Sequence, residues 1–236
     1  LHPQHRRQRQ MCIRDSSHVS FFLLPSSLKQ MTNTQKKYGL AIHTTSPELG
    51  LAVSNFGKDT RFKTWNLGRD LSTHLHQKLQ EFMPPQTWQD LSFIVVAKGP
   101  GSFTGTRIGI VTARTLAQQL DIPLFAISTL ATIAWSYKQE SQNLSLQMRG
   151  QKGQLFTAIY QPGEMGLNPV LVDTLMNPVA WKEMLANLGN SYHLIQVENS
   201  LGKSVVSLLE LAHLEWGKGN RPHWSEALPF YGQNPV

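Results

Sequence analysis

The stretch KGPGSFTGTRIGIVTARTLAQQL, Lys98 to Leu120, joins a glycine turn to a long helical pattern. Residues 93–97 before it read FIVVA, a short run rich in β-branched residues that is typical of a buried strand. A Gly-Pro-Gly sequence then turns the chain, and Ser102 or Thr104 stands where a helix N-cap belongs. We therefore predict a strand, a tight turn and a helix that ends before Asp121.

Small residues recur every four positions along this predicted helix, at Gly105, Gly109, Ala113 and Ala117. A row of side chains spaced by four is one of the ridges along which helices pack, and small residues let another backbone come close. Each glycine inside a helix costs about 1 kcal/mol relative to alanine. We therefore expect this ridge, called the small-residue ridge below, to make a close contact with another element.

Glycines before a helix also occur in nucleotide-binding loops, but the spacing here differs from both common motifs. A P-loop reads GxxxxGK[ST], with the lysine opening the helix, whereas Lys98 precedes the glycines. A dinucleotide fingerprint reads GxGxxG, whereas Gly99, Gly101 and Gly105 are spaced GxGxxxG. Spacing alone thus favours a strand-to-helix turn whose glycines supply unusual backbone angles.

The block KGPGSFTGTRIGIVTARTLA, followed by IPLFAISTLATIA at 122–134, resembles the signature of the bacterial TsaB family. The resemblance is strong from Lys98 to about Ala134, recognisable from about Tyr38, and weak after Gln142. TsaB proteins are the non-catalytic partner subunits in the machinery that makes threonylcarbamoyladenosine in transfer RNA. The resemblance implies an α/β fold of the actin-like (ASKHA), ribonuclease H-like kind, with a mixed sheet flanked by helices and a second lobe that is small and degenerate.

The resemblance also implies partners. They are a TsaD-like catalytic subunit, which transfers threonylcarbamoyl to the adenosine beside the anticodon, a TsaE-like ATPase and, through the complex, transfer RNA. A homodimer is a further possible assembly. We expect the chain to be cytoplasmic and free of membranes, to have no catalytic residue, and to hold no cofactor or metal by itself. ATP and metal are then expected in the partner subunits.

By the same resemblance, the predicted helices at 71–82 and 104–120 are expected to join a helix bundle with TsaD. Their expected interface residues are Leu71, Leu75, Leu79, Thr104, Gly105, Arg107, Ile108, Gly109, Thr112, Ala113 and Ala117. The signature loop that leads into the second helix consists of Gly99, Pro100, Gly101, Ser102 and Phe103. Arg107 and Arg114 are expected on one helix face, where they meet acidic groups of a partner or stay solvated.

Two enzymatic alternatives remain, an ATP-dependent transferase or kinase and an M22-type peptidase, which share this fold. The resemblance places His43 where actin-like families carry an Asp for metal and phosphate, and an imidazole does not replace a carboxylate facing Mg²⁺. His74 and His76 are two apart, so a helix points them to different faces rather than at one metal. Ser102 lacks the following glycine of the GxSxG motif, which favours a helix cap over a nucleophile. A test of ATP binding by the isolated chain would distinguish the transferase or kinase from a non-catalytic subunit. An assay for bound metal would distinguish the peptidase from it.

The pattern of strands and helices predicts two lobes. Three strands, one beginning at Tyr38 and two near 49–53 and 62–67, are joined by short turns, followed by a helix, and begin an α/β lobe. We assign this lobe to residues 36–137. The polar residues 138–143 are then the predicted hinge, and 141–230 form the smaller C-terminal lobe.

Composition and charge are those of an ordinary globular chain. The sequence has 236 residues, of which 40% are hydrophobic and 16% charged. Its net charge is +7, but residues 1–30 contribute +4, because five of them are Lys or Arg and one is Asp. The rest carries only +3, so no strong phosphate-binding surface is indicated.

Residues 1–30 show no hydrophobic period that could pack into a core. We expect them to be non-native or disordered, an upstream artefact of translation or assembly, with Met31 as the true start. An Arg-rich transit segment is the alternative. The only cysteine, Cys12, lies in this segment, so no disulfide is expected in the fold.

Overall fold

The computed structural model describes residues 37–189, 191–198 and 200–232, so the prediction for residues 1–30 and Cys12 lies outside the described residues. Its first sheet has the strand order β3-β2-β1-β4-β5. These strands are β1 (Tyr38–His43), β2 (Glu48–Ser54), β3 (Thr60–Asn66), β4 (Leu91–Ala97) and β5 (Leu124–Ile127). β1, β2 and β3 pair antiparallel, whereas β4 runs parallel to β1 and β5 runs parallel to β4.

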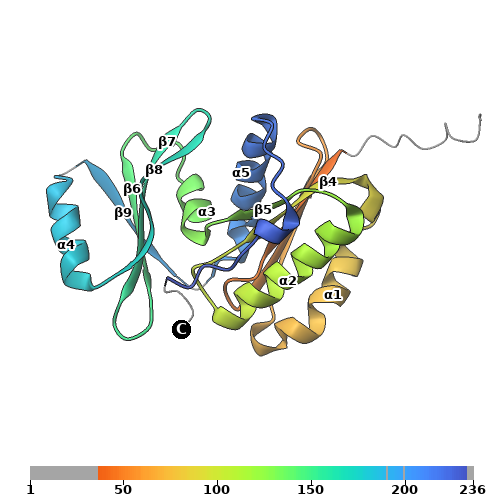
Figure 1. Cartoon of the computed structure of the whole chain (residues 1–236), viewed down its shortest axis with the longest axis horizontal. Helices are drawn as coiled ribbons and strands as arrows, with labels where there is room; N and C mark the ends of the chain where they lie inside the picture. Colours follow the sequence, from red (N-terminus) through yellow and green to blue (C-terminus); the bar gives the residue numbers. More distant parts are fainter. Residues whose placement is uncertain (1–36, 190, 199, 233–236) are drawn as a thin grey trace, which may run out of the picture. The chain divides into compact units, whose positions relative to one another are not determined.

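Helices cover both faces of this sheet (Figure 1). The helices α1 (Leu71–Phe82) and α2 (Phe103–Leu120) lie on one face, and α5 (Val205–Gly217) lies on the other. Because successive side chains of a strand point to opposite faces, Leu40 and Ile42 of β1 pack toward α1 and α2, while Ala41 packs toward α5. The near-continuous apolar sequence of the central strands follows from this two-sided burial.

The second sheet has the strand order β8-β7-β6-β9. Its strands are β6 (Asn143–Arg149), β7 (Leu155–Gly163), β8 (Gly166–Met176) and β9 (Tyr192–Val197). β6, β7 and β8 form an antiparallel meander, and β9 pairs parallel with β6. The helix α3 (Thr129–Trp135) packs on one face, and α4 (Pro178–Asn187) covers the other through Trp181 and Leu185.

Short 3-10 helices complete the described elements, at η2 (Gly68–Asp70), η3 (Trp88–Asp90), η4 (Gly202–Ser204) and η5 (Trp224–Glu226). The C-terminal segment beyond η5 returns to the centre of the molecule. There the Phe230 backbone N–H donates to the Lys98 carbonyl oxygen at 2.7 Å. This segment therefore covers the signature loop, a contact that its sequence, which reads as an extended end, did not predict.

The predicted mixed α/β fold, with two mixed sheets flanked by helices, is confirmed. The predicted lobe ranges, 36–137 and 141–230, stay a prediction. Within the second range, however, α5 packs on the first sheet, where Trp216 stacks on Phe93 with ring centroids 5.2 Å apart. The described residues all belong to one compact unit.

Candidate partner interface

The signature loop is shaped by close contact with the turn that follows β1. Gly99 and Gly101 have φ values of +100° and +151°, a region that residues with a Cβ rarely adopt. A Cβ added at Gly101 would overlap the carbonyl oxygen of Thr45. The next backbone N–H, that of Ser102, donates to the same oxygen at 2.7 Å. The glycines of this loop thus allow the start of α2 to dock on the β1 turn.

Ser102 is the N-cap of α2. Its Oγ accepts a hydrogen bond from the Gly105 backbone N–H at 3.2 Å, while the Thr106 Oγ1 donates to the Ser102 carbonyl at 2.7 Å. A side-chain oxygen that satisfies a free N–H in the first turn is the usual role of serine at this position. The prediction that Ser102 caps a helix is therefore confirmed.

The small-residue ridge of α2 faces the interior of its own chain. A Cβ added at Gly105 would overlap the Thr44 carbonyl oxygen, and one added at Gly109 would overlap the Thr44 Oγ1. The same Thr44 Oγ1 donates to the Gly105 carbonyl at 2.9 Å. Ala113 and Ala117 continue the ridge into the core and are fully buried. Their close approach is therefore to the β1 turn and the first sheet of their own chain, and their contact with a partner stays a prediction.

The predicted interface leucines are also core residues. Leu71, Leu75 and Leu79 are 4%, 0% and 2% exposed and pack between α1 and the first sheet, and Thr112 of α2 is buried as well. An apolar stripe at three- and four-residue steps marks the buried side of a surface helix. The stripe lies on the buried side of α1, and its place in a partner interface stays a prediction.

The opposite side of α2 is exposed and forms what we call the outer face. It consists of Thr104, Arg107, Val111, Thr115 and Gln118, with Ile108 half-buried at its margin. Steps of three and four residues keep these side chains on one side of the helix. Of the residues predicted at the interface, Thr104, Arg107 and Ile108 lie on this face, together with Val111, which was not among them and is 62% exposed. Its place four residues after Arg107 is the signal that could have found it.

An aromatic and basic cluster begins the outer face. The Arg107 guanidinium lies 5.3 Å from the centroid of the Phe103 ring, and the Tyr231 ring lies 4.6 Å from that ring. Phe103 is still 53% exposed. Arg114, predicted beside Arg107, instead covers the Trp224 ring at 5.6 Å. The outer face therefore combines exposed apolar side chains with a cation held against an aromatic ring.

His43 lies at the end of β1, next to the turn that contacts α2. It is fully buried, and neither ring nitrogen has a hydrogen-bond partner among the described residues. Burial lowers the pKa of His43 to about 4, so the ring is neutral at pH 7. A buried neutral imidazole offers no oxygen ligand, so this position does not fit a Mg²⁺–nucleotide site of the actin-like kind.

The two histidines of α1 that the sequence analysis considered as metal ligands are not part of a metal site. The His74 Nδ1 is 3.1 Å from the carbonyl oxygen of Asp70, the residue that precedes α1, and His76 is exposed. Within residues 37–189, 191–198 and 200–232, His, Cys, Asp and Glu side chains form no group of three that could hold a metal ion. No helix in the same ranges combines the length and apolar character needed to cross a bilayer.

Comparison with known proteins shows which family the chain belongs to. Residues 71–198 match the family model described as TsaD, tRNA N6-adenosine threonylcarbamoyltransferase. The chain is 40% identical over 118 residues to the Bacillus subtilis tRNA threonylcarbamoyladenosine biosynthesis protein TsaB, covering 50% of this chain and 52% of that protein. The Escherichia coli protein of the same name is 36% identical over 81 residues, or 33% of this chain and 35% of that protein. The matches thus span about half the length of these curated relatives, or less.

Two solved structures from Pseudomonas aeruginosa have the same fold. One is described as YeaZ, with a TM-score of 0.67 at 19% identity, covering 83% of this chain and 99% of that chain. The other, described as an uncharacterized protein with similarity to peptidase YeaZ, has a TM-score of 0.68 at 18% identity and covers 84% and 100%. At this identity the likeness concerns the fold alone. With a family model matched over more than half of its residues and relatives that are TsaB proteins, the chain belongs to the family that the TsaD model describes and is one of its TsaB members.

Proposed function

We propose that this chain is the non-catalytic scaffold subunit of a complex that forms N6-threonylcarbamoyladenosine next to the anticodon of transfer RNA. Its relatives are named for the biosynthesis of this nucleoside, and the matching family model is that of the threonylcarbamoyltransferase TsaD. The chain binds a TsaD-type catalytic subunit and holds it in the competent state. A TsaE-type ATPase and transfer RNA join through the complex, in the cytoplasm.

The outer face of α2 is the observation that carries this proposal. It presents Val111, Phe103 and the Arg107 guanidinium on a rigid helix whose other side is fixed in the core. Aromatic residues and arginine are enriched at the centres of protein interfaces, and a few such side chains supply most of the binding energy. A helix anchored by its inner residues can present these groups with little loss of conformational entropy on binding.

The chemistry is assigned to the partner subunits. Ser102 is engaged as a helix cap, and His43 is a buried neutral ring without an acidic partner. Neither supplies the activated nucleophile or the oxygen ligands that acyl transfer from a nucleotide-activated donor requires. We therefore place ATP, its metal ion and the transfer step in the TsaD-type and TsaE-type subunits.

Reconstitution tests this assignment. The chain is mixed with the TsaD and TsaE homologues of the same genome and with unmodified transfer RNA, and the modified nucleoside is measured by mass spectrometry. Product is expected only when both the chain and TsaD are present, and the chain alone should neither bind ATP–Mg at micromolar concentration nor hydrolyse it. Full activity without the chain, or ATP turnover by the chain alone, would refute the scaffold role.

A homodimer through the same face is the competing assembly. Light scattering of the chain alone and with TsaD separates the two, because a heterodimer that forms through the outer face must consume any homodimer. If the homodimer persists unchanged beside bound TsaD, the two partners use different surfaces.

A further inference from the structure

The segment that follows η5, residues 227–232, runs beside α2 in the direction opposite to it, and we call this segment the strap. Just before it, the Trp224 ring lies 5.6 Å from the Arg114 guanidinium, which belongs to a later turn of α2. Near its end, the Tyr231 ring lies 4.6 Å from the ring of Phe103, the first residue of α2. The strap therefore follows one side of α2 back to its start (Figure 1).

The strap is fixed to the body of the protein by the residues on either side of Tyr231. The Phe230 N–H donates to the Lys98 carbonyl oxygen, and the Phe230 ring lies 6.4 Å from the ring of Phe156 in β7. Gly232 has a φ of +75°, and a Cβ added there would overlap the Phe156 ring. The backbone of the strap is thus held in place without any contribution from the Tyr231 side chain.

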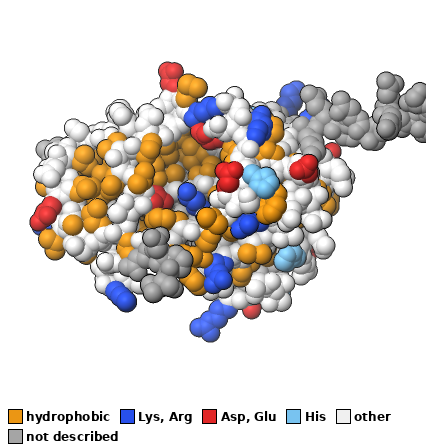
Figure 2. All heavy atoms as spheres, viewed as in Figure 1, with side chains coloured by type: hydrophobic (Ala, Val, Ile, Leu, Met, Phe, Trp, Pro, Cys, Tyr) orange, Lys and Arg blue, Asp and Glu red, His pale blue; other side chains and the backbone are white. Residues whose placement is uncertain are grey.

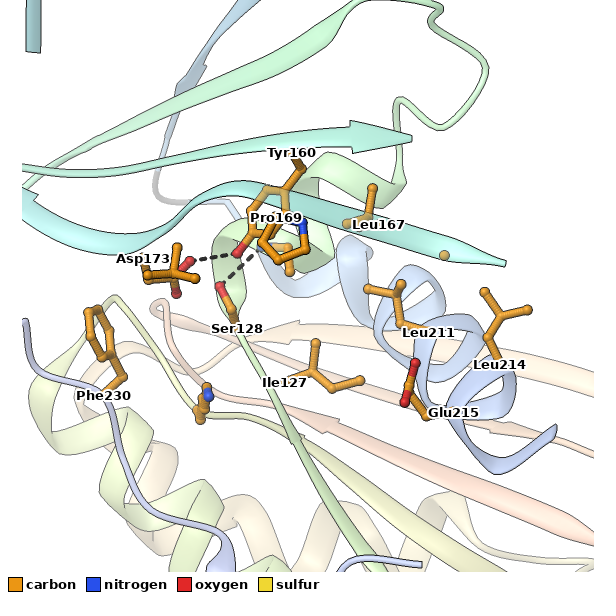
Figure 3. A pocket seen from close by; sticks show the side chains of 14 residues that line it. Ile127, Ser128, Tyr160, Leu167, Pro169, Asp173, Leu211, Leu214, Glu215 and Phe230 are labelled. Carbon is orange, nitrogen blue, oxygen red and sulfur yellow. Dashed lines mark hydrogen bonds between the residues drawn. The ribbon is translucent and has the colours of Figure 1, made fainter. Parts of the chain in front are cut away.

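Phe230 is also part of the wall of a cavity. This cavity has a volume of about 480 Å³, and the other residues of its wall include Lys98, Ile127, Val172, Asp173 and Leu214. Figure 3 shows the Phe230 ring at one end of the cavity and Leu214 of α5 at the other, and Figure 2 shows apolar side chains gathered on this face of the molecule. The apolar wall favours the position of the phenyl ring and so anchors the strap.

Tyr231 contacts a different part of the molecule from its neighbour Phe230. Its ring packs on Phe103, whose ring also lies 5.3 Å from the Arg107 guanidinium. Among the described residues, Tyr231 supplies the only ring that packs on Phe103. Because Phe103 is 53% exposed, few other contacts restrict its side chain. The anchored strap therefore holds an aromatic ring against the exposed cluster that begins the outer face.

We propose that Tyr231 is a positioning residue of the partner interface. By packing on Phe103, it fixes the exposed phenyl ring, and with it the Arg107 guanidinium, in the arrangement that TsaD binds. An exposed side chain otherwise samples several rotamers, and ordering it during association opposes binding. Tyr231 orders the cluster before TsaD arrives. This inference rests on the proposed function, which supplies TsaD as the partner of the outer face.

Calorimetry of the full chain with TsaD tests this role, and thermal melts show that each variant is folded. Tyr231→Ala should weaken binding by about tenfold, because Phe103 and Arg107 must then be ordered on association. Tyr231→Phe keeps the ring and should bind within about twofold of the unmodified chain. Tyr137→Ala is the matched control, since it removes another partly exposed tyrosine, whose ring lies 5.5 Å from that of His193 in β9. It should leave the affinity unchanged.

A double-mutant cycle shows whether Tyr231 acts through Phe103. Phe103→Ala should weaken binding by about tenfold or more. The variant with both Phe103→Ala and Tyr231→Ala should bind about as weakly as Phe103→Ala alone, because Tyr231 then has no ring to position. Additive losses, or equal affinities of Tyr231→Ala and Tyr137→Ala, would overturn the positioning role and leave the scaffold proposal intact. If the unmodified chain itself does not bind TsaD, the proposed function is refuted and this inference with it.

Discussion

The two sides of α2 differ in what their residues touch. On the inner side, Gly105 and Gly109 contact Thr44 of the β1 turn, and Ala113 lies in the core of the first sheet. On the outer side, Arg107 and Val111 face solvent, with Arg107 against an exposed aromatic ring. The inner side thus positions the helix, and the outer side is accessible for binding a partner.

This difference shows why small residues in a helix do not by themselves identify a partner surface. A glycine allows close approach of any backbone, whether it belongs to the same chain or to another. Here the backbone that approaches is that of the β1 turn, where the Thr45 hydroxyl also accepts from Thr129 of α3 at 3.1 Å. One buried polar turn therefore fixes the starts of two helices.

The largest expected effect comes from filling the inner side. Gly105→Leu places a side chain against the Thr44 carbonyl, and backbone cannot move away as a flexible side chain can. Overpacking typically costs about 1–3 kcal/mol, and we expect the free energy of unfolding to fall by about 3 kcal/mol or more. Thr115→Leu, on the outer face of the same helix, is the control and should leave stability within about 0.5 kcal/mol in chemical denaturation. Equal stability of the two variants would contradict the assignment of the inner side.

Lowering the pH should destabilise the fold through His43, the buried imidazole beside that turn. The pKa of His43 is about 4 in the folded chain and 6.5 when unfolded, so the unfolded state binds the proton more readily. Stability from this residue is therefore complete above pH 6.5 and is lost as the pH falls toward 4. Between pH 7.5 and 4.5 the loss should be about 2.5 kcal/mol, at 1.36 kcal/mol per pKa unit. His43→Leu should remove this part of the pH dependence in denaturant titrations, and an unchanged slope would show that His43 does not titrate as inferred.

A charge introduced on the outer side of α2 should weaken the binding of TsaD without lowering the stability of the chain. Val111→Glu should leave the melting curve nearly unchanged, because the side chain is 62% exposed. Its carboxylate would be buried without a partner in a complex with TsaD, which should weaken binding by at least tenfold, or about 1.4 kcal/mol. Val170→Glu on β8, where the valine is 54% exposed, is the matched control for calorimetry. Equal affinities for the two variants would remove Val111 from the interface.

The smallest expected effect concerns the cap at the start of the helix. Ser102→Ala removes the oxygen that accepts from the Gly105 N–H, and loss of such a cap costs about 1 kcal/mol. Thermal melts should show this modest loss without any change in the modification reaction at a temperature where both forms are folded. An activity loss larger than the stability loss explains would assign Ser102 a chemical role.

The sequence predicted most of the fold because local patterns and tertiary contacts agree. The structure contains the three predicted elements in order. FIVVA lies in β4, the Gly-Pro-Gly turn forms the signature loop, and the capped helix is α2. Periodicity also located Leu71, Leu75 and Leu79, but it cannot tell whether an apolar stripe packs on the same chain or on another. Nor can it show that residues 228–232 return to place Tyr231 on Phe103, or that Lys98 and Asp173 line one cavity, because those contacts join segments distant in sequence.

Protection of a single side chain on the outer face shows whether TsaD binds there. In a Cys12→Ser background, Val111→Cys and Val170→Cys each introduce one thiol at an exposed valine position, and the rate of thiol labelling is measured with and without TsaD. Saturating TsaD should slow labelling at position 111 by at least tenfold and leave labelling at position 170 unchanged. Unchanged labelling at position 111 in a complex that has demonstrably formed would show that the outer face of α2 is not where the partner binds.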